Sequence, residues 1–214
     1  MIDIFVMPKD NQTQDTETRI LEAAEREFLT KGFAGARTTS IAEAAGVTHA
    51  MFHYYFRTKE KLFDRIITEK ISLLKKVLLE SISDADMPLE DKIRNAIERH
   101  LDFIAANPDL PRFLVGEVFN SPARTAILLD KIKAYAPAML AELQRQIDDA
   151  ASKGIFRHVD ARMLIIDITS LNIFSFMVSP LINAVLGGYA VGSKAFVEQR
   201  KKENFETIMR KLKP

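Results

Sequence analysis

Apolar residues recur every three or four positions along most of the chain, which is the spacing of amphipathic helices. A helix is predicted over 15–31 with Gly32 as its stop, and a longer one runs from Thr58 for about six turns. Further helices are expected over 88–106, 110–120, 125–153, 160–179 and 193–212. The helix over 125–153 is expected to kink at Pro137, and a loop with Gly187 and Gly188 precedes the last helix. Strand-like alternation is absent from the sequence, which therefore predicts an all-α fold.

The stretch from Thr38 to Lys61 has the pattern of a helix-turn-helix. Two short helices are separated at Gly46, where a tight turn needs the positive φ that glycine adopts freely. Ala42 is small enough for the close crossing of the two helices, and the expected buried anchors are Val47, Phe52 and Tyr55. Such a unit presents its second helix, 48–56, to the major groove of DNA. The sequence thus predicts a nucleic-acid reader.

Composition and charge restrict the alternatives. A chain of 214 residues with 47% apolar residues can bury a sizeable core, and the absence of cysteine excludes disulfides and thiolate metal sites. The formal net charge is +1, but residues 57–76 hold seven lysines or arginines against three acids. This local excess of four positive charges directly follows the predicted recognition helix in the sequence, and it is a modest basic patch that suits nucleic acid.

Two apolar stretches could be mistaken for membrane signals. Residues 1–7 are too short and carry Asp3 instead of a basic leader, so 1–14 is interpreted as a flexible arm. Residues 163–178 contain Asp167 and Asn172, which are costly in hydrocarbon, and fit a helix buried on two sides better. The chain is therefore expected in the cytoplasm.

The motif TTSIAEAAGVTHAMFHYYFRTKEKLF resembles the TetR family of one-component transcriptional regulators. The similarity covers 19–63, and it rests on residues that fall in register with the family pattern: Ile41, Ala42, Gly46, Val47, Phe52, Tyr54, Phe56, Lys59 and Leu62. The resemblance implies a three-helix DNA-binding domain over 15–62, joined by a long connector helix to an effector-binding and dimerisation domain over 63–214. It also implies a homodimer paired through the helices 160–179 and 193–212, with Phe196, Val197, Phe205 and Ile208 at the seam.

The same resemblance assigns DNA contacts residue by residue. Hydroxyls and helix N-termini suit phosphate oxygens, and phosphate contacts are assigned in this way to Thr38, Thr39, Thr48, Tyr54 and Lys59. Positions that in the family face base edges are occupied by His49, Ala50 and Met51. His53, one turn after His49, stands where the family often has tyrosine and is also assigned to the DNA contacts. Each of three residues also has an alternative role that involves no DNA. Tyr54 could belong to an aromatic core cluster, Lys59 could lie on a solvated face, and His53 could point only to solvent.

Two departures from the family pattern affect the predicted reading of bases. Family members commonly carry lysine or arginine where His49 stands and glycine where Ala50 stands. Ala50 and Met51 can touch a thymine methyl but cannot donate to guanine, so readout is expected to combine apolar contacts with what His49 donates. Because imidazole titrates near neutrality, operator affinity is predicted to strengthen between about pH 7.5 and 6.

The sequence is less informative about the effector-binding site than about the DNA-binding domain. An apolar or aromatic effector is expected in a pocket between helices, with candidate contacts at His100, Phe103, Phe113, Glu117, Tyr135, Met139, Asn172 and Phe176. Phe and Met at helical spacing are most often plain core, and a histidine such as His100 is more often a hydrogen-bonded structural residue than a ligand. No catalytic or metal-binding constellation can be assembled, so neither an enzyme nor a cofactor is predicted. Ligand-relieved repression is the expected mechanism, with activation, or a helical interaction module that does not bind DNA, as alternatives.

Overall fold

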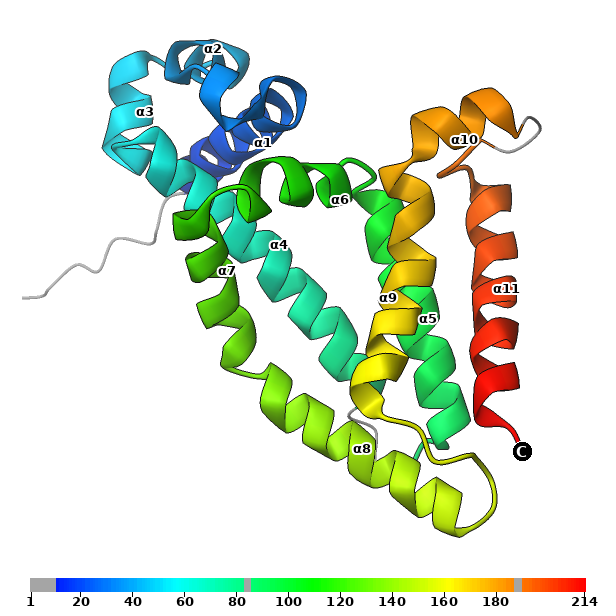
Figure 1. Cartoon of the computed structure of the whole chain (residues 1–214). Helices are drawn as coiled ribbons and strands as arrows, with labels where there is room; N and C mark the ends of the chain where they lie inside the picture. The colour runs from blue at the N-terminus through cyan, green and yellow to red at the C-terminus, as the bar shows by residue number, and fades with distance from the viewer. Residues whose placement is uncertain (1–10, 83–85, 187–189) are drawn as a thin grey trace, which may run out of the picture. The chain divides into compact units, whose positions relative to one another are not determined.

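A computed structural model describes residues 11–82, 86–186 and 190–214, and these residues form helices and turns without a strand among them (Figure 1). The predicted all-α class is confirmed. The chain divides into two compact units, one ending at Glu69 and the other beginning at Lys70. The predicted loop at Gly187 and Gly188 lies outside the described residues.

The first unit contains α1 (Asn11–Gly35), α2 (Thr38–Ala44), α3 (His49–Phe56) and the beginning of α4 (Lys59–Ile82). Most of the predicted arm, 1–10, lies outside the described residues, and α1 already includes Asn11. Gly32 interrupts α1 with φ of 68° and ψ of 173°, in a region that side chains disfavour. The predicted stop is therefore a break, after which the helix resumes as far as Gly35.

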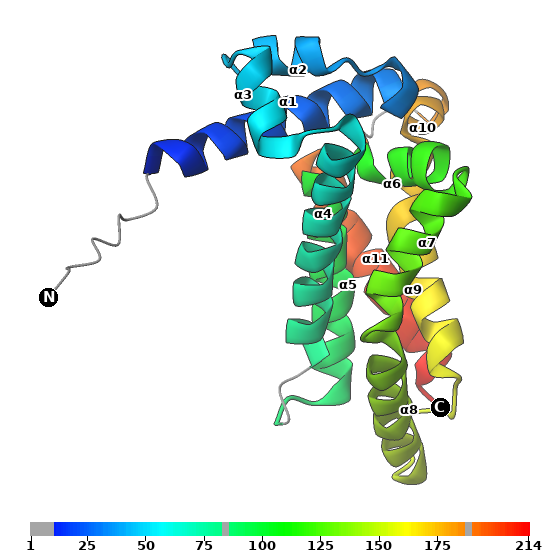
Figure 2. The same cartoon turned by 90° about the vertical axis from the view of Figure 1, so that its left-hand side faces the viewer.

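Aromatic and aliphatic side chains fill the core of the first unit. Phe28 and Phe63 meet edge to face with ring centroids 5.3 Å apart, and Phe33 meets Phe63 at 5.1 Å in the same way. Ile41 and Phe52 are fully buried, so α2 and α3 each contribute at least one side chain to the centre of the unit. α2 lies against both α1 and α3 (Figure 2).

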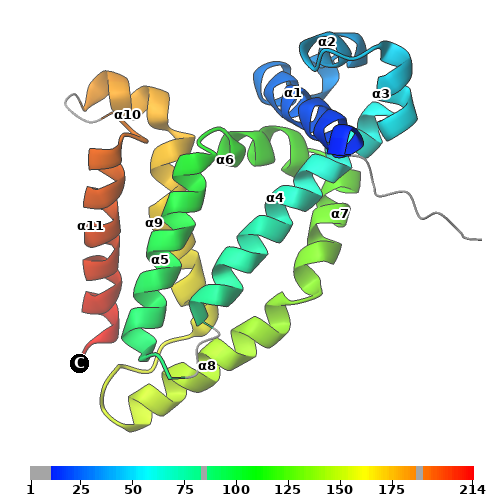
Figure 3. The same ribbon diagram turned by 180° about the vertical axis from the view of Figure 1, so that it is seen from behind.

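The second unit contains the rest of α4 and the helices that follow it. These are α5 (Leu89–Ala106), α6 (Leu110–Phe113), the π-helix η1 (Leu114–Phe119), α7 (Pro122–Lys133), α8 (Ala136–Ser152), α9 (Ala161–Met177), α10 (Ser179–Val185) and α11 (Lys194–Leu212). α5, α9 and α11 lie side by side (Figure 3). With α8 they bury a common apolar core that includes Ile97, Ile147, Leu164 and Ile208.

One predicted helix of the second unit is wrong, and another helix was not predicted. The single helix over 125–153 is two helices, because Pro137 lacks the N–H for an interior hydrogen bond and stands in the first turn of the new helix α8. The stretch after 179 is also helical, since Pro180 opens α10 in the same manner. Both errors came from treating proline as a kink or an end, when it equally marks a beginning.

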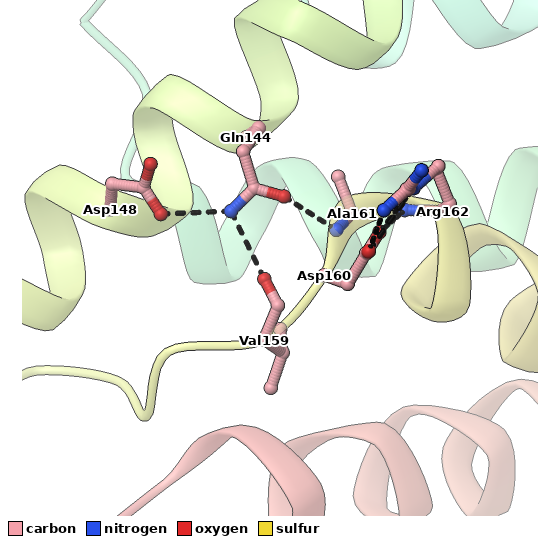
Figure 4. A network of polar contacts seen from close by, with 6 residues as sticks. All are labelled: Gln144, Asp148, Val159, Asp160, Ala161 and Arg162. Carbon is pink, nitrogen blue, oxygen red and sulfur yellow. Dashed lines mark hydrogen bonds and ion pairs between the residues drawn. The ribbon is translucent and has the colours of Figure 1, made fainter.

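The start of α9 is fixed to α8 by a polar network (Figure 4). Gln144 accepts from the Ala161 backbone N–H at 2.8 Å and donates to the Val159 carbonyl at 3.1 Å and to Asp148 at 2.8 Å. Asp160 is the N-cap residue of α9, and its carboxylate accepts from the backbone N–H of Arg162 at 2.7 Å. The ion pair with Arg162 lowers the pKa of Asp160 to about 2.

No single helix among the described residues is long and apolar enough to cross a membrane. α9 and α10 together satisfy length and composition, but they are bent by 67° where they meet.

Candidate nucleic-acid interface

The helix α3 is held from behind and capped at its start. Phe52 is fully buried and Phe56 is 7% exposed, so one face of α3 faces the core. Thr48 is the N-cap residue, and its hydroxyl accepts from the Met51 backbone N–H at 3.2 Å. Gly46 has φ of 67°, as the predicted turn requires. The local sequence therefore forms the expected helix-turn-helix.

The residues predicted to face DNA lie on the free side of this motif. Side chains classed as exposed include those of Thr39, Thr48, His49, Ala50, Met51, His53 and Tyr54, while Thr38 is half-buried. Tyr54 is 81% exposed, so it does not belong to a core cluster, although its ring meets that of half-buried Tyr55 at 5.4 Å. Whether each residue contacts DNA stays a prediction.

A chain of hydrogen bonds links the two histidines of α3. His53 Nδ1 lies 2.9 Å from the carbonyl oxygen of Arg57, and His53 Nε2 lies 3.2 Å from His49 Nε2. His49 Nε2 also lies 3.1 Å from the hydroxyl oxygen of Thr38 on α2. The two rings meet edge to face, with centroids 4.4 Å apart. The face expected to read bases is thus pre-arranged across both helices.

This chain determines which nitrogen of each neutral ring carries the proton. The Arg57 carbonyl can only accept, so His53 Nδ1 must be the donor and His53 Nε2 an acceptor. His49 Nε2 must then donate, which leaves His49 Nδ1 with a lone pair. Thr38 accepts from the same N–H, and its own proton is available for a phosphate oxygen. Neutral His49 therefore offers an acceptor, in contrast to the donor expected from the sequence.

Lys59 has a structural role that the sequence did not indicate. Its ammonium donates to the carbonyl oxygens of Phe33 at 2.8 Å and Ala36 at 3.0 Å, and it lies 4.6 Å from the centre of the Phe33 ring. These contacts fasten the end of α1 to the start of α4. Since the ammonium has three N–H groups, one is left for the predicted phosphate contact. Exposed Lys61 and Arg57 lie in the same region of the sequence.

The second unit contains a small cavity of about 80 Å³ between α4, α5, α8 and α9. Of the predicted effector contacts, His100 and Met139 line it. Phe103, Phe113 and Phe176 are buried, with exposures of 6%, 9% and 1%. Glu117 pairs with Arg124 at 3.4 Å, and Tyr135 lies under Lys75 at 5.1 Å. Partial burial raises the pKa of Tyr135.

His100 and Asn172 belong to a buried polar network. Asn172 donates to the Ile97 carbonyl at 2.9 Å and to His100 Nδ1 at 3.2 Å, and it accepts from Asn204 at 2.8 Å. Burial lowers the pKa of His100 to about 4, so the ring is neutral at physiological pH. The network joins α5, α9 and α11 in the middle of an apolar core.

The cavity lining that the sequence analysis missed is aliphatic, apart from Lys92 and Thr169. It consists of Leu78, Leu89, Ile93, Ala96, Leu143, Leu164, Ile165 and Ile168. Lys92 is 5% exposed. A signal was present, because Lys92, Ala96 and His100 are spaced by four residues and share one face of α5.

The predicted dimer seam is partly wrong. Phe196, Val197, Phe205 and Ile208 of α11 are buried within their own chain, at 7%, 6%, 8% and 2% exposure. Apolar side chains stand instead on the outer side of α9 and on α10, where Met163, Ile166, Phe174, Leu181, Val185 and Leu186 are each at least 50% exposed. The apolar face available to a partner thus comes from α9 and α10.

Comparison with known proteins relates both units to characterised families. Residues 20–66 match the family model of bacterial regulatory proteins, tetR family, and residues 90–208 match the tetracyclin repressor-like C-terminal domain. The uncharacterized HTH-type transcriptional regulator YdgC of Bacillus subtilis is 29% identical over 113 residues, which are 51% of this chain and 57% of that protein. The HTH-type transcriptional repressor SCO4008 of Streptomyces coelicolor is 38% identical over 103 residues, 48% of this chain and 49% of that protein. The chain thus spans about half the length of these relatives.

The fold is also that of solved regulators. The structure of the ketosteroid transcriptional regulator KstR2 of Mycobacterium tuberculosis superposes with a TM-score of 0.69 at 16% identity. The superposition covers 92% of this chain and 95% of that one.

Proposed function

The chain belongs to the TetR family of bacterial regulatory proteins, and on that premise we propose that it is a DNA-binding transcriptional repressor in the cytoplasm. It binds a palindromic operator as a homodimer and leaves it when a small molecule occupies the second unit. The family consists of regulators, and the chain is not an enzyme.

The observation that carries this proposal is the orientation of α3. His49, Met51 and His53 are exposed while Phe52 and Phe56 are buried behind them. A helix held in this way can enter the major groove, about 12 Å wide, without disturbing its own core. If His49, Met51 and His53 were buried instead, α3 would have no side chains available to contact bases.

The exposed groups divide into two kinds of contact. The hydroxyls of Thr38, Thr39 and Thr48 and the ring of Tyr54 suit phosphate oxygens, which position the protein without reading sequence. His49 Nδ1, an acceptor in the neutral ring, suits the amino group of adenine or cytosine. Met51 suits a thymine methyl.

We expect a dimer because a single short recognition helix contacts too few bases. Two readers related by a two-fold axis contact half-sites about 34–36 Å apart, one turn of duplex. The exposed apolar face of α9 and α10 supports a partner surface, because isolated monomers rarely leave such a patch in water. Next to it, a groove of about 600 Å³ is lined by Phe174, Ile182 and Leu186, which extend this apolar face.

Release requires the effector to bind two states of the protein unequally. The cavity touches Leu78 of α4, and α4 is one continuous helix from Lys59 to Ile82. A ligand that enlarges the cavity therefore displaces a helix that begins beside the reader in the sequence. The coupling lowers operator affinity by the same factor by which DNA lowers ligand affinity.

Selection of bound sequences from a random duplex pool tests the proposal. A palindrome with half-sites one turn apart, bound with a steep salt dependence, is the expected result. A helical interaction module would enrich no sequence and show no excess over random DNA. An activator would enrich the same palindrome but raise transcription from it, so a reporter assay separates the two regulators.

A further inference from the structure

The cavity in the second unit adjoins a larger groove at Lys92. Leu89 and Lys92 line both the cavity and a groove of about 690 Å³ between α5 and α8. Seven of the thirteen residues that line the groove are polar or charged, whereas the cavity walls are mostly aliphatic. Lys92 therefore stands between a groove of mixed polarity and an apolar cavity.

The other charges around the groove are already paired. Glu90 lies 3.1 Å from Lys213, Glu142 lies 2.7 Å from Arg145, and Asp149 lies 2.7 Å from Lys153. Each carboxylate that lines the groove thus has a cation of its own.

Lys92 differs from these cations. It is 5% exposed, and its ammonium donates to the neutral amide oxygen of Gln146 at 3.2 Å. Glu142 lies near enough for Lys92 to contribute to the low pKa of its carboxyl group, but Arg145 and Gln146 already hold the oxygens of Glu142. Among the described residues, no carboxylate forms an ion pair with Lys92. Burying an ammonium without an anion is destabilising, and a bound anion would offset this cost.

We propose that Lys92 is the anchor of a binding site for an aliphatic monocarboxylate. The carboxylate pairs with the Lys92 ammonium at the mouth, and the hydrocarbon chain enters the cavity between Ile93, Leu143 and Leu164. This site deepens the proposed function, on which it rests in taking the second unit as the effector-binding part.

The chemistry of the walls restricts the ligand further. His100 is neutral and is the other titratable group of the lining, so the cavity offers one cation and suits one negative charge. No aromatic ring other than the imidazole lines the cavity, so of the apolar or aromatic effectors expected from the sequence an alkyl chain is favoured. At about 80 Å³ the cavity is smaller than ligand pockets of roughly 300–1,000 Å³. A chain that fills it must push its walls apart.

The test is calorimetric titration of the full chain with octanoate and with 1-octanol, which has the same chain without the charge. We expect saturable binding of octanoate and at least tenfold weaker binding of 1-octanol. Lys92→Met keeps the length of the side chain and should weaken octanoate binding by about tenfold to a hundredfold, the value of a hydrogen bond to a charged group. Lys153→Met, which removes an exposed cation of the same groove, is the matched control and should leave binding unchanged.

Equal binding of octanoate and 1-octanol, or undiminished octanoate binding by Lys92→Met, would overturn the site. Should Lys92→Met not fold, Lys92→Gln keeps a polar group and provides the same comparison. Operator binding is measured separately on the same samples. Intact operator binding without octanoate binding refutes the site alone, whereas octanoate binding that leaves operator affinity unchanged refutes release by this ligand and leaves the site in place.

Discussion

Replacing His53 with alanine should weaken the base preference of the protein while leaving the His49 contact in place. In the wild type, the Arg57 carbonyl orients the proton of His53, and His53 in turn holds the proton of His49 on Nε2. His49 Nδ1 is then an acceptor. His53→Ala removes this constraint, so His49 can place its proton on either nitrogen and present a donor or an acceptor.

The size of the effect follows from the worth of one base contact. A good contact discriminates against the wrong base by about 1–3 kcal/mol, which is roughly a fivefold to 150-fold preference. The wild type should show this preference for adenine or cytosine over guanine at the base that His49 contacts. In His53→Ala the preference should fall to within about twofold, because both tautomers become available.

The assay is competition between duplexes that differ only at that base, followed by fluorescence anisotropy at pH 8 and fixed salt. Met51→Ala is the control, since it removes a neighbouring contact and leaves the histidine chain intact. A wild-type preference for guanine, or an unchanged preference in His53→Ala, would refute the assignment of the proton.

Three further outcomes are expected. Lys59→Met should lower the free energy of unfolding by about 2–3 kcal/mol through loss of its two carbonyl contacts, and exposed Lys61→Met should change it little; equal melting curves would contradict the structural role. Phe174→Glu, at a position 63% exposed, should shift the protein from dimer to monomer in sedimentation while the circular dichroism spectrum stays the same, and a persistent dimer would exclude this face. The pKa of His100 is about 4 in the fold and 6.5 in the unfolded chain, so between these pH values the unfolded state binds a proton that the folded state does not bind. Stability present above pH 6.5 should fall by about 3 kcal/mol as the pH drops to 4, and denaturant titrations of His100→Gln should lack this component.

The first unit could be predicted closely because its signals are local. Gly46 marks the turn, Thr48 caps the reader, and Phe52 anchors it, and each of these follows from the residue and its immediate neighbours. The partners of Lys59 could not be predicted in this way. Its carbonyl acceptors are 26 and 23 residues away and lie at the end of α1, where the last carbonyls of a helix have no intrahelical partner.

The second unit was harder to predict because its faces are decided by packing between helices. The apolar positions of α9 and α11 look alike in the sequence, yet Phe205 is buried in its own chain and Phe174 is not. Phe113 and Phe176 were expected to line a pocket and are core, while Lys92 was overlooked because a lysine is usually placed at the surface. Periodicity identifies a buried face but does not say which neighbour covers it.

The polar network around Asn172 has a consequence for how the second unit can deform. Both amide protons of Asn172 are engaged, one on Ile97 of α5 and one on His100, and its oxygen holds Asn204 of α11. If α9 slid by one turn against α5 or α11, these donors and acceptors would be buried without hydrogen-bond partners, which is destabilising. The three helices are therefore expected to move as one rigid block. Expansion of the cavity must then displace α4 and α8, the two cavity walls that the Asn172 network does not join.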